Sequence, residues 1–379
     1  MPESKSGASR IVVLDTLRGV AAVGVAYFYH WVWVFGSLEA ADRSMFPGAG
    51  WAIFDWLYNY GYLMVELFFV ISGFIFVHVY FEKIRSGSVS WLTYMKLRVA
   101  RLWPMFVFSS LVVFSLQIYR ILFGMGVFYP EIPFKISDVI LSLGFLQSGI
   151  FNSLFAMNAP LWSVCVEMVM YIVFFYTVML SKNKDWSYIG LFIGLMVAGV
   201  GIVAIKADYL LFNPLISRGL VGFFSGSLTY FAYRNLGKVL ENPVKARLNF
   251  VLILVLSLLL FSLLWIELGS GVFGNLNMIY SIFVFPVLIL LILYSKLLNM
   301  LASLKPFRVL GNMSYSIYIM SFPVVILLNT LVESLGLNLD FYSRKVFLSY
   351  MLVGLLVSYL VHILFEKPSH AAMKRVLKV

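Results

Sequence analysis

Charged residues are scarce in this sequence of 379 residues, because Asp, Glu, Lys and Arg together make up only 12% of it. An ordinary soluble domain carries about twice that share. Hydrophobic residues make up 62%, and the mean hydropathy is +0.94. A chain of this size cannot bury so much apolar surface in one core, so lipid must cover the rest. The composition argues against a soluble enzyme, a disordered protein and a nucleic-acid partner, and it predicts an all-α polytopic membrane helix bundle.

Cysteine and histidine are also rare. Cys165 is the single cysteine, which excludes an intrachain disulfide, and the four histidines are scattered. No His or Cys pair has the spacing of metal ligands, and no phosphate-binding loop or dinucleotide-binding glycine pattern occurs. We therefore expect neither a metal site nor a covalently bound cofactor.

The long apolar runs predict about ten transmembrane helices of about 20 residues each. A further apolar stretch, 138–150, is too short to cross a bilayer, so we expect it to lie at the interface or to be re-entrant. We expect residues 1–379 to form one integral membrane domain with no appended soluble domain. The predicted spans are 11–34, 60–82, 102–123, 160–181, 188–206, 214–233, 248–267, 278–295, 314–333 and 345–365.

The basic residues predict the orientation of these spans. The sequence has 28 Lys and Arg residues against 17 Asp and Glu, a net charge of +11. Twenty of the 28 fall in cytoplasmic segments when the N-terminus is placed inside. Because cytoplasmic loops are enriched in Lys and Arg, both termini are predicted to be cytoplasmic.

Several ionisable residues lie at membrane depth, where their cost makes each a candidate for function. Helix rise places His30, Glu66 and Glu167 about 7–10 Å below the outer ends of three spans, so they share one layer. Arg18 lies deeper, at a depth similar to that of Ser72. A histidine beside a carboxylate can act as a general base on a hydroxyl. A structural network between helices and the proton relay of a transporter remain open alternatives.

Arg98 and Arg101 lie three residues apart at the start of the third predicted span, on one face of the helix. Two guanidinium groups on one face can clamp a phosphate. On spacing alone, simple anchoring of the span at the cytoplasmic surface is the more common role of such residues.

Six sequence elements follow one another along the chain: LDTLRGVAAVGVAYFYH (14–30), GYLMVELFFVISGFIF (61–76), KLRVARLWP (96–104), APLWSVCVEMVMY (159–171), LGNMSYSIYIMSFPV (310–324) and FEKPSH (365–370). In this order they resemble the motifs of the acyltransferase-3 family of integral membrane O-acyltransferases. The resemblance covers nearly the whole chain.

The resemblance implies an O-acetyltransferase with ten helices in the cell inner membrane. Its donor would be cytoplasmic acetyl-CoA. Its acceptor would be a hydroxyl of an extracytoplasmic or lipid-linked glycan, such as O-antigen or exopolysaccharide, with polysaccharide-assembly machinery as a further partner. The family's functional positions map onto Arg18, His30, Glu66, Arg98, Arg101, Glu167 and Glu366.

Three departures from the family pattern stand out. Eleven residues separate Arg18 from His30, where ten are usual, and one extra residue turns a helix by about 100°. A π-bulge in the first span would restore the register. Met168 stands where a second acid is common and Ser321 where a histidine is common, which would fit a variant acceptor or acyl site.

The resulting hypothesis makes His30 the general base, oriented by Glu66 or Glu167. Arg98 and Arg101 would hold the phosphates of acetyl-CoA, and Arg18 and Ser72 would contact its arm or thioester. The candidate oxyanion or substrate contacts are Trp162, Ser163 and Ser321. Two alternatives remain open: a secondary transporter of a glycan or small solute, and an inactive homologue that serves as a scaffold.

Overall fold

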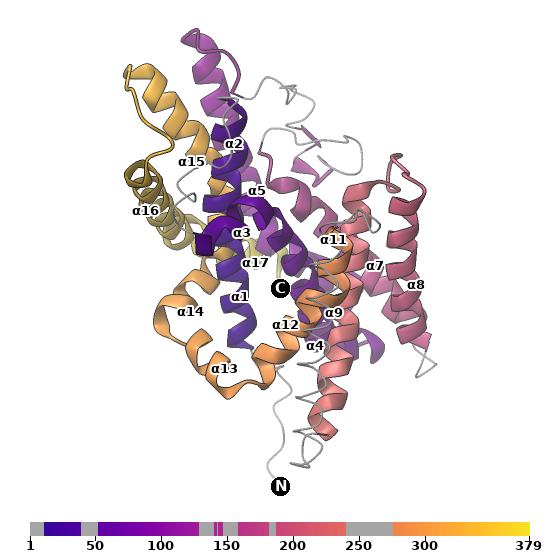
Figure 1. Cartoon of the computed structure of the whole chain (residues 1–379). Helices are drawn as coiled ribbons and strands as arrows, with labels where there is room; N and C mark the ends of the chain where they lie inside the picture. The colour runs from indigo at the N-terminus through magenta and orange to yellow at the C-terminus, as the bar shows by residue number, and fades with distance from the viewer. Residues whose placement is uncertain are drawn as a thin grey trace.

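Helices form nearly all of the regular structure, as the apolar runs predict. The computed structural model describes residues 11–38, 52–128, 140–141, 143–146, 158–181, 187–239 and 276–379. Within these ranges the single isolated β-bridge joins Tyr209 to Phe212, and no strand occurs. The chain is therefore an all-α polytopic helix bundle, as predicted (Figure 1).

The first half of the chain supplies the helices that later frame the site. The first span is interrupted by a π-helical turn, η1, and α4 is preceded by a short 3₁₀ turn, η4. These elements are α1 (Val12–Val23), η1 (Gly24–Tyr29), α2 (His30–Leu38), α3 (Ala52–Tyr60), η4 (Gly61–Leu63), α4 (Met64–Arg85), α5 (Trp91–Leu122), α7 (Leu161–Leu180), α8 (Ser187–Ala204) and α9 (Pro214–Val239).

The second half contains two further π-helical turns, η5 and η6, and two short helices, α13 and α14, before the long helix α15. Its elements are α11 (Leu276–Ile279), η5 (Tyr280–Val284), α12 (Phe285–Tyr294), α13 (Lys296–Ala302), α14 (Lys305–Asn312), α15 (Ser314–Ser334), α16 (Arg344–Val361), η6 (His362–Glu366) and α17 (Lys367–Leu377).

Among the described residues, eight helical segments are long and apolar enough to cross a membrane, so the chain is a multi-pass membrane protein. Nine of the ten predicted spans coincide with described helices, including 214–233, which falls within α9. The remaining prediction, 248–267, lies outside the described residues, as does most of the predicted interfacial stretch 138–150.

Two predicted boundaries differ most from those observed. Helix α5 begins at Trp91 rather than at 102, because the Ser90 side chain accepts a hydrogen bond from the backbone N–H of Thr93 and caps the helix there. The last span continues from α16 through η6 into α17, past the expected end at 365. The widened turn just before Pro368 lets the helix pass a residue that lacks a backbone donor.

Close packing of α4 against α9 fixes the centre of the bundle. A Cβ added at Gly73 would lie 1.8 Å from the carbonyl oxygen of Phe223, and one added at Gly226 would lie 1.9 Å from that of Val70. Small residues let membrane helices approach backbone to backbone. Helix α9 also packs along α8, so α4, α9 and α8 lie side by side (Figure 1).

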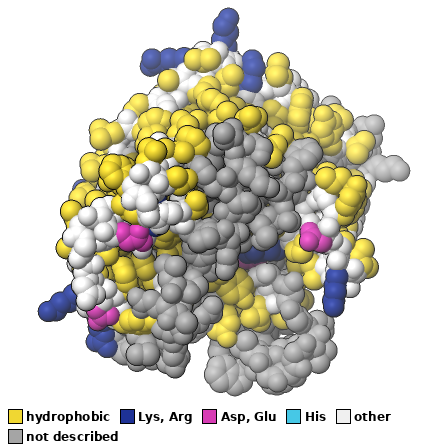
Figure 2. Space-filling view, turned by 90° about the horizontal axis from the view of Figure 1, so that it is seen from above, with side chains coloured by type: hydrophobic (Ala, Val, Ile, Leu, Met, Phe, Trp, Pro, Cys, Tyr) yellow, Lys and Arg dark blue, Asp and Glu magenta, His cyan; other side chains and the backbone are white. Residues whose placement is uncertain are grey.

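The described surface is mainly apolar. In the view from above, hydrophobic side chains cover most of the described part of the face, and charged side chains are few and dispersed (Figure 2). Large exposed hydrophobic residues lie along α8, α15 and α16, among them Val197, Leu331 and Leu352. This is the surface expected where helices meet lipid rather than water.

Candidate functional site

A cavity of about 340 Å³ lies among α1, α4, α5, α7, α15 and α17, and we call it the basic cavity. Its lining contains basic groups from three helices that are far apart in sequence. The basic lining residues are Arg18, Arg98, Arg101, His370 and Lys374, against two acidic ones, Asp15 and Glu167. The excess of positive charge makes the basic cavity suited to a ligand that carries several negative charges.

Arg98 is held in place by aromatic rings. Its guanidinium carbon lies 4.8 Å from the ring centre of Tyr80 and 5.1 Å from that of Phe76, and one of its N–H groups donates to the Tyr80 hydroxyl. Arg101, one helical turn further along α5, is exposed and lines the same cavity. The α5 spacing therefore presents one fixed and one exposed guanidinium group to a single ligand.

Glu167 belongs to the basic cavity and is tied to α4. The Ser72 hydroxyl donates to Glu167 Oε1 and lies 3.5 Å from the Tyr171 hydroxyl. Arg18 lines the same cavity, so the structure brings Arg18 and Ser72 together as their similar depths indicate.

A second, smaller cavity of about 190 Å³ contains His30, and we call it the His30 cavity. It lies among η1, α4, α7, α9 and α15. Its lining combines aromatic and polar groups with one cation. The polar and aromatic lining residues are Tyr29, His30, Tyr62, Trp162, Arg218 and Tyr318.

His30 is buried and its Nδ1 lies 3.1 Å from the hydroxyl of Ser321. The Ser321 hydroxyl donates its proton to the backbone carbonyl of Tyr318, at 2.8 Å. A hydroxyl has one proton, so with that proton on the Tyr318 carbonyl, Ser321 Oγ accepts from His30 and Nδ1 carries the hydrogen. The two contacts fit the tautomer in which Nε2 holds the lone pair, the form that a general base requires.

Glu66 on α4 is paired with Arg218 on α9. Arg218 Nε lies 2.5 Å from Glu66 Oε1, and Glu66 is fully buried. The Arg218 guanidinium carbon also lies 4.5 Å from the Trp162 ring centre. The two carboxylates expected to orient His30 therefore bind other groups: Glu66 binds Arg218 and Glu167 binds Ser72. The side-chain contact to His30 Nδ1 comes from Ser321 instead.

The π-helical turn η1, Gly24–Tyr29, lies between Arg18 and His30. A π turn takes in one residue more than an α turn, so it compensates for the additional residue in this interval. Arg18 then lines the basic cavity, and His30, the first residue of α2, lines the adjoining one. The bulge expected from the altered spacing is confirmed.

Every predicted site residue except Glu366 lines one of these two cavities or contacts one of their lining residues. Ser163 lines the basic cavity, and Trp162, next to it on α7, lines the His30 cavity. Glu366 lies in η6, where its Oε2 accepts from the Ser316 hydroxyl at 2.6 Å and lies 2.7 Å from His362 Nδ1.

Sequence reasoning missed several lining residues, and four of them lie in or beside the recognised motifs. His370 and Lys374 lie four residues apart on α17, and this basic spacing, which begins at the last residue of the FEKPSH motif, is the signal that would have identified them. Tyr315 and Tyr318 lie three residues apart on α15 within the SYSIY element, again on one helix face. The family resemblance includes both motifs, but it gives no functional role to these four side chains.

A model of the acyltransferase-3 family, described as an acyltransferase domain, matches residues 11–364. The chain belongs to this family. As an acyltransferase-3 protein with many apolar helices, it is a membrane acyltransferase.

One curated relative supports the same grouping. The chain is 26% identical to "Protein 2 in picA locus" from Rhizobium radiobacter over 175 residues, which are 44% of this chain and 81% of that protein. No solved structure matches the chain. The geometry of this acyltransferase-3 site is therefore described from this structure alone.

Proposed function

We propose that this acyltransferase moves an acetyl group from cytoplasmic acetyl-CoA to a hydroxyl of an extracytoplasmic or lipid-linked glycan, with His30 as the general base. The observation that carries the proposal is the pairing of a basic cavity with an adjoining cavity that holds a histidine whose Nδ1 contacts the Ser321 hydroxyl. A donor with phosphates and an acceptor with hydroxyls need these two environments.

The basic cavity supports acetyl-CoA as the donor. Arg98, Arg101 and Lys374 line it and would bind the phosphates of the nucleotide, since guanidinium groups match phosphate geometry. The pantetheine arm would then extend past Ser72 and Arg18 toward Ser163. Its thioester would lie at the end of the basic cavity that is nearest to α7 and α15.

The His30 cavity supports a sugar as the acceptor. The aromatic side chains of Tyr29, Tyr62 and Trp162 present flat apolar faces together with polar tips. Arg218, held by Glu66, adds fixed N–H donors. The small volume favours one sugar unit, so a polymeric glycan would place a single residue or chain end in it.

The reaction follows from this arrangement. His30 Nε2 removes the proton from the acceptor hydroxyl as that oxygen attacks the thioester carbonyl carbon. The C–S bond then breaks, and the CoA thiolate leaves with the proton that His30 releases. Ser321 keeps Nδ1 protonated through both steps and stabilises the imidazolium by accepting its hydrogen bond.

The predicted orientation, with both termini cytoplasmic, fits this scheme. It would place Arg98, Arg101 and α17 on the inner side of the cell inner membrane, where acetyl-CoA is made. It would place His30 toward the outer side, where surface glycans are assembled, so polysaccharide-assembly machinery would supply the acceptor.

The test is acetylation by membranes that contain matched amounts of wild-type protein, His30→Ala or His78→Ala. His78 is a suitable control, because it lies on α4 against Tyr230 and lines neither cavity. We expect acetylated glycan from wild type and His78→Ala and almost none from His30→Ala. Acetylation retained by His30→Ala would refute the base role.

A further inference from the structure

Among the described residues, Tyr318 alone lines both the basic cavity and the His30 cavity. It is buried on α15, one helical turn before Ser321. Its ring centre lies 5.5 Å from that of Phe68 on α4. The Tyr318 side chain is therefore part of the wall between the two cavities.

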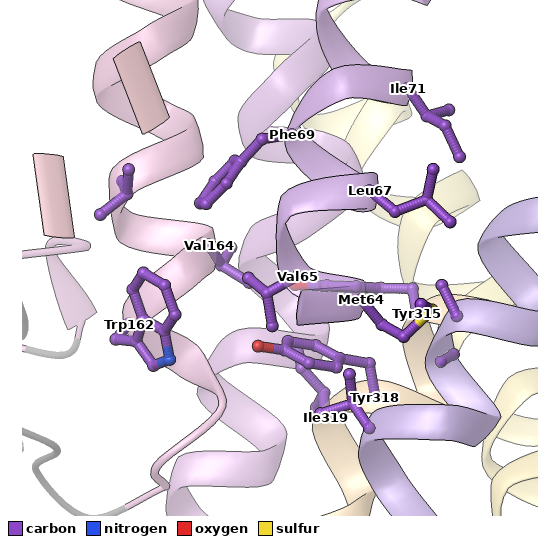
Figure 3. Close-up of a cluster of buried hydrophobic side chains, with 14 of the residues drawn as sticks. Met64, Val65, Leu67, Phe69, Ile71, Trp162, Val164, Tyr315, Tyr318 and Ile319 are labelled. Carbon is purple, nitrogen blue, oxygen red and sulfur yellow. The ribbon is translucent and has the colours of Figure 1, made fainter. Parts of the chain in front are cut away.

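The hydroxyl of Tyr318 reaches across this wall to α7. It lies 2.9 Å from the hydroxyl of Ser163, which lines the basic cavity. Figure 3 shows the Tyr318 ring lying across from α15 beside Val65, with its oxygen toward the helix that carries Trp162 and Val164. The hydroxyl pair thus lies at the wall that the two cavities share.

The backbone of the same residue holds the base. The Tyr318 carbonyl accepts the Ser321 proton, which in turn leaves Ser321 Oγ to accept from His30 Nδ1. One turn of α15 therefore fixes a phenolic hydroxyl on one side of the wall and the imidazole on the other. An acyl-transfer centre needs both of these groups, a base within reach of the attacking hydroxyl and a donor for the oxyanion that develops on the carbonyl.

We propose that the Tyr318 hydroxyl is the oxyanion donor of the transfer reaction, acting across the wall between the two cavities. This inference rests on the proposed function. The acceptor oxygen forms its bond to the thioester carbon, the hydroxyl proton passes to His30 Nε2, and negative charge moves onto the carbonyl oxygen. Tyr318 donates its hydrogen bond to that oxygen. When the carbonyl re-forms, the C–S bond breaks, and the thiolate takes the proton back from His30.

The hydrogen bond with Ser163 prepares the hydroxyl for this role. Either hydroxyl of this pair can be the donor, and when Ser163 donates to Tyr318, the Tyr318 hydroxyl stays at the wall with its own proton available for the carbonyl oxygen. Tyr29, Tyr62, Trp162 and Arg218 also bring hydrogen-bond donors to the His30 cavity. Among the described residues, Tyr318 is the donor that lines the basic cavity as well, and Arg218 is already bound to Glu66.

The experiment compares wild type, Tyr318→Phe and a matched control, Tyr294→Phe, in detergent. Tyr318→Phe removes one oxygen and keeps the ring that separates the cavities. Tyr294 donates its hydroxyl to the backbone carbonyl of Tyr233, so the control loses one hydroxyl away from both cavities. We expect Tyr318→Phe to lower kcat by about 10²-fold, the usual cost of one oxyanion donor, with unchanged acetyl-CoA affinity. Tyr294→Phe should match wild type.

Each other result has a distinct meaning. If wild type transfers acetyl groups and Tyr318→Phe does so at a similar kcat, the oxyanion role is wrong and the proposed function stands. If Tyr318→Phe loses acetyl-CoA affinity in parallel with kcat, Tyr318 holds the donor and the oxyanion role is again wrong. If wild type neither binds acetyl-CoA nor transfers the group, the proposed function itself fails.

A second variant, Ser163→Ala, tests the same hydroxyl pair if Tyr318→Phe fails to fold. Ser163→Ala leaves Tyr318 intact but removes the hydroxyl that holds it at the wall. We expect a smaller decrease in kcat at unchanged acetyl-CoA affinity. A Ser163→Ala protein with wild-type kcat would contradict the prepared position of the Tyr318 hydroxyl.

Discussion

Adding and removing one residue in the π-helical turn η1 should have opposite consequences. The turn Gly24–Tyr29 already takes in the additional residue between Arg18 and His30. Deleting Ala26 would let the turn close into an ordinary α-helix and leave both flanking segments in place. Inserting an alanine after Ala26 would add a second extra residue, which the turn has no further capacity to absorb.

The size of the expected movement follows from helix geometry. One uncompensated residue rotates the following helix by about 100°, and at a radius of about 5 Å this moves a side chain by about 8 Å. The bond of 3.1 Å between His30 Nδ1 and Ser321 Oγ would then be lost. Because a misplacement of 1 Å can cost about 10²-fold in rate, the insertion should lower acetyl transfer by at least that factor.

The assay is acetyl transfer by membranes with matched amounts of each protein. The control is an alanine inserted after Gly336, in the exposed connection between α15 and α16, which we expect to be tolerated. The deletion should retain activity and the insertion should not. Equal loss of activity in both η1 variants, with the loop insertion active, would refute the reasoning.

Three further predictions concern packing and the base. Glu66→Ala leaves the Arg218 charge buried, so unfolding free energy in detergent should fall by about 3–5 kcal/mol, and an unchanged melting temperature would contradict the buried pair. Gly226→Ala places a Cβ against the backbone of α4, so stability should fall by about 1–3 kcal/mol; a variant as stable as wild type would contradict the contact. Ser321→Ala removes the acceptor for His30 Nδ1, so kcat should fall with little change in the KM for acetyl-CoA, whereas a pure rise in KM would indicate a donor contact.

Helix positions were predictable because bilayer thickness sets the length of apolar runs. The ends were less predictable where local chemistry decides them. The Ser90 cap starts α5 well before the apolar run, and η6 carries the last helix past Pro368. These are interactions of one or two groups, which average hydropathy does not report.

The sequence predicted which residues belong to the site better than it predicted which side chains those residues contact. Depth along a helix correctly grouped Arg18 with Ser72, because rise per residue is fixed. Depth says nothing about lateral position, so it did not show that Glu66 binds Arg218. The predicted layer was wrong for Glu167, which lies with Ser72 and Arg18 in the basic cavity and not with His30. The lateral arrangement depends on close packing such as that of α4 on α9, which brings distant segments together.

The most direct test of the account is the binding of acetyl-CoA to the purified protein, measured by calorimetry. Free CoA and the double variant Arg98→Ala/Arg101→Ala are the controls. The account predicts saturable binding that the double variant weakens strongly, since both arginines line the basic cavity. No binding to well-folded wild-type protein would contradict it and would favour solute transport or a scaffold role.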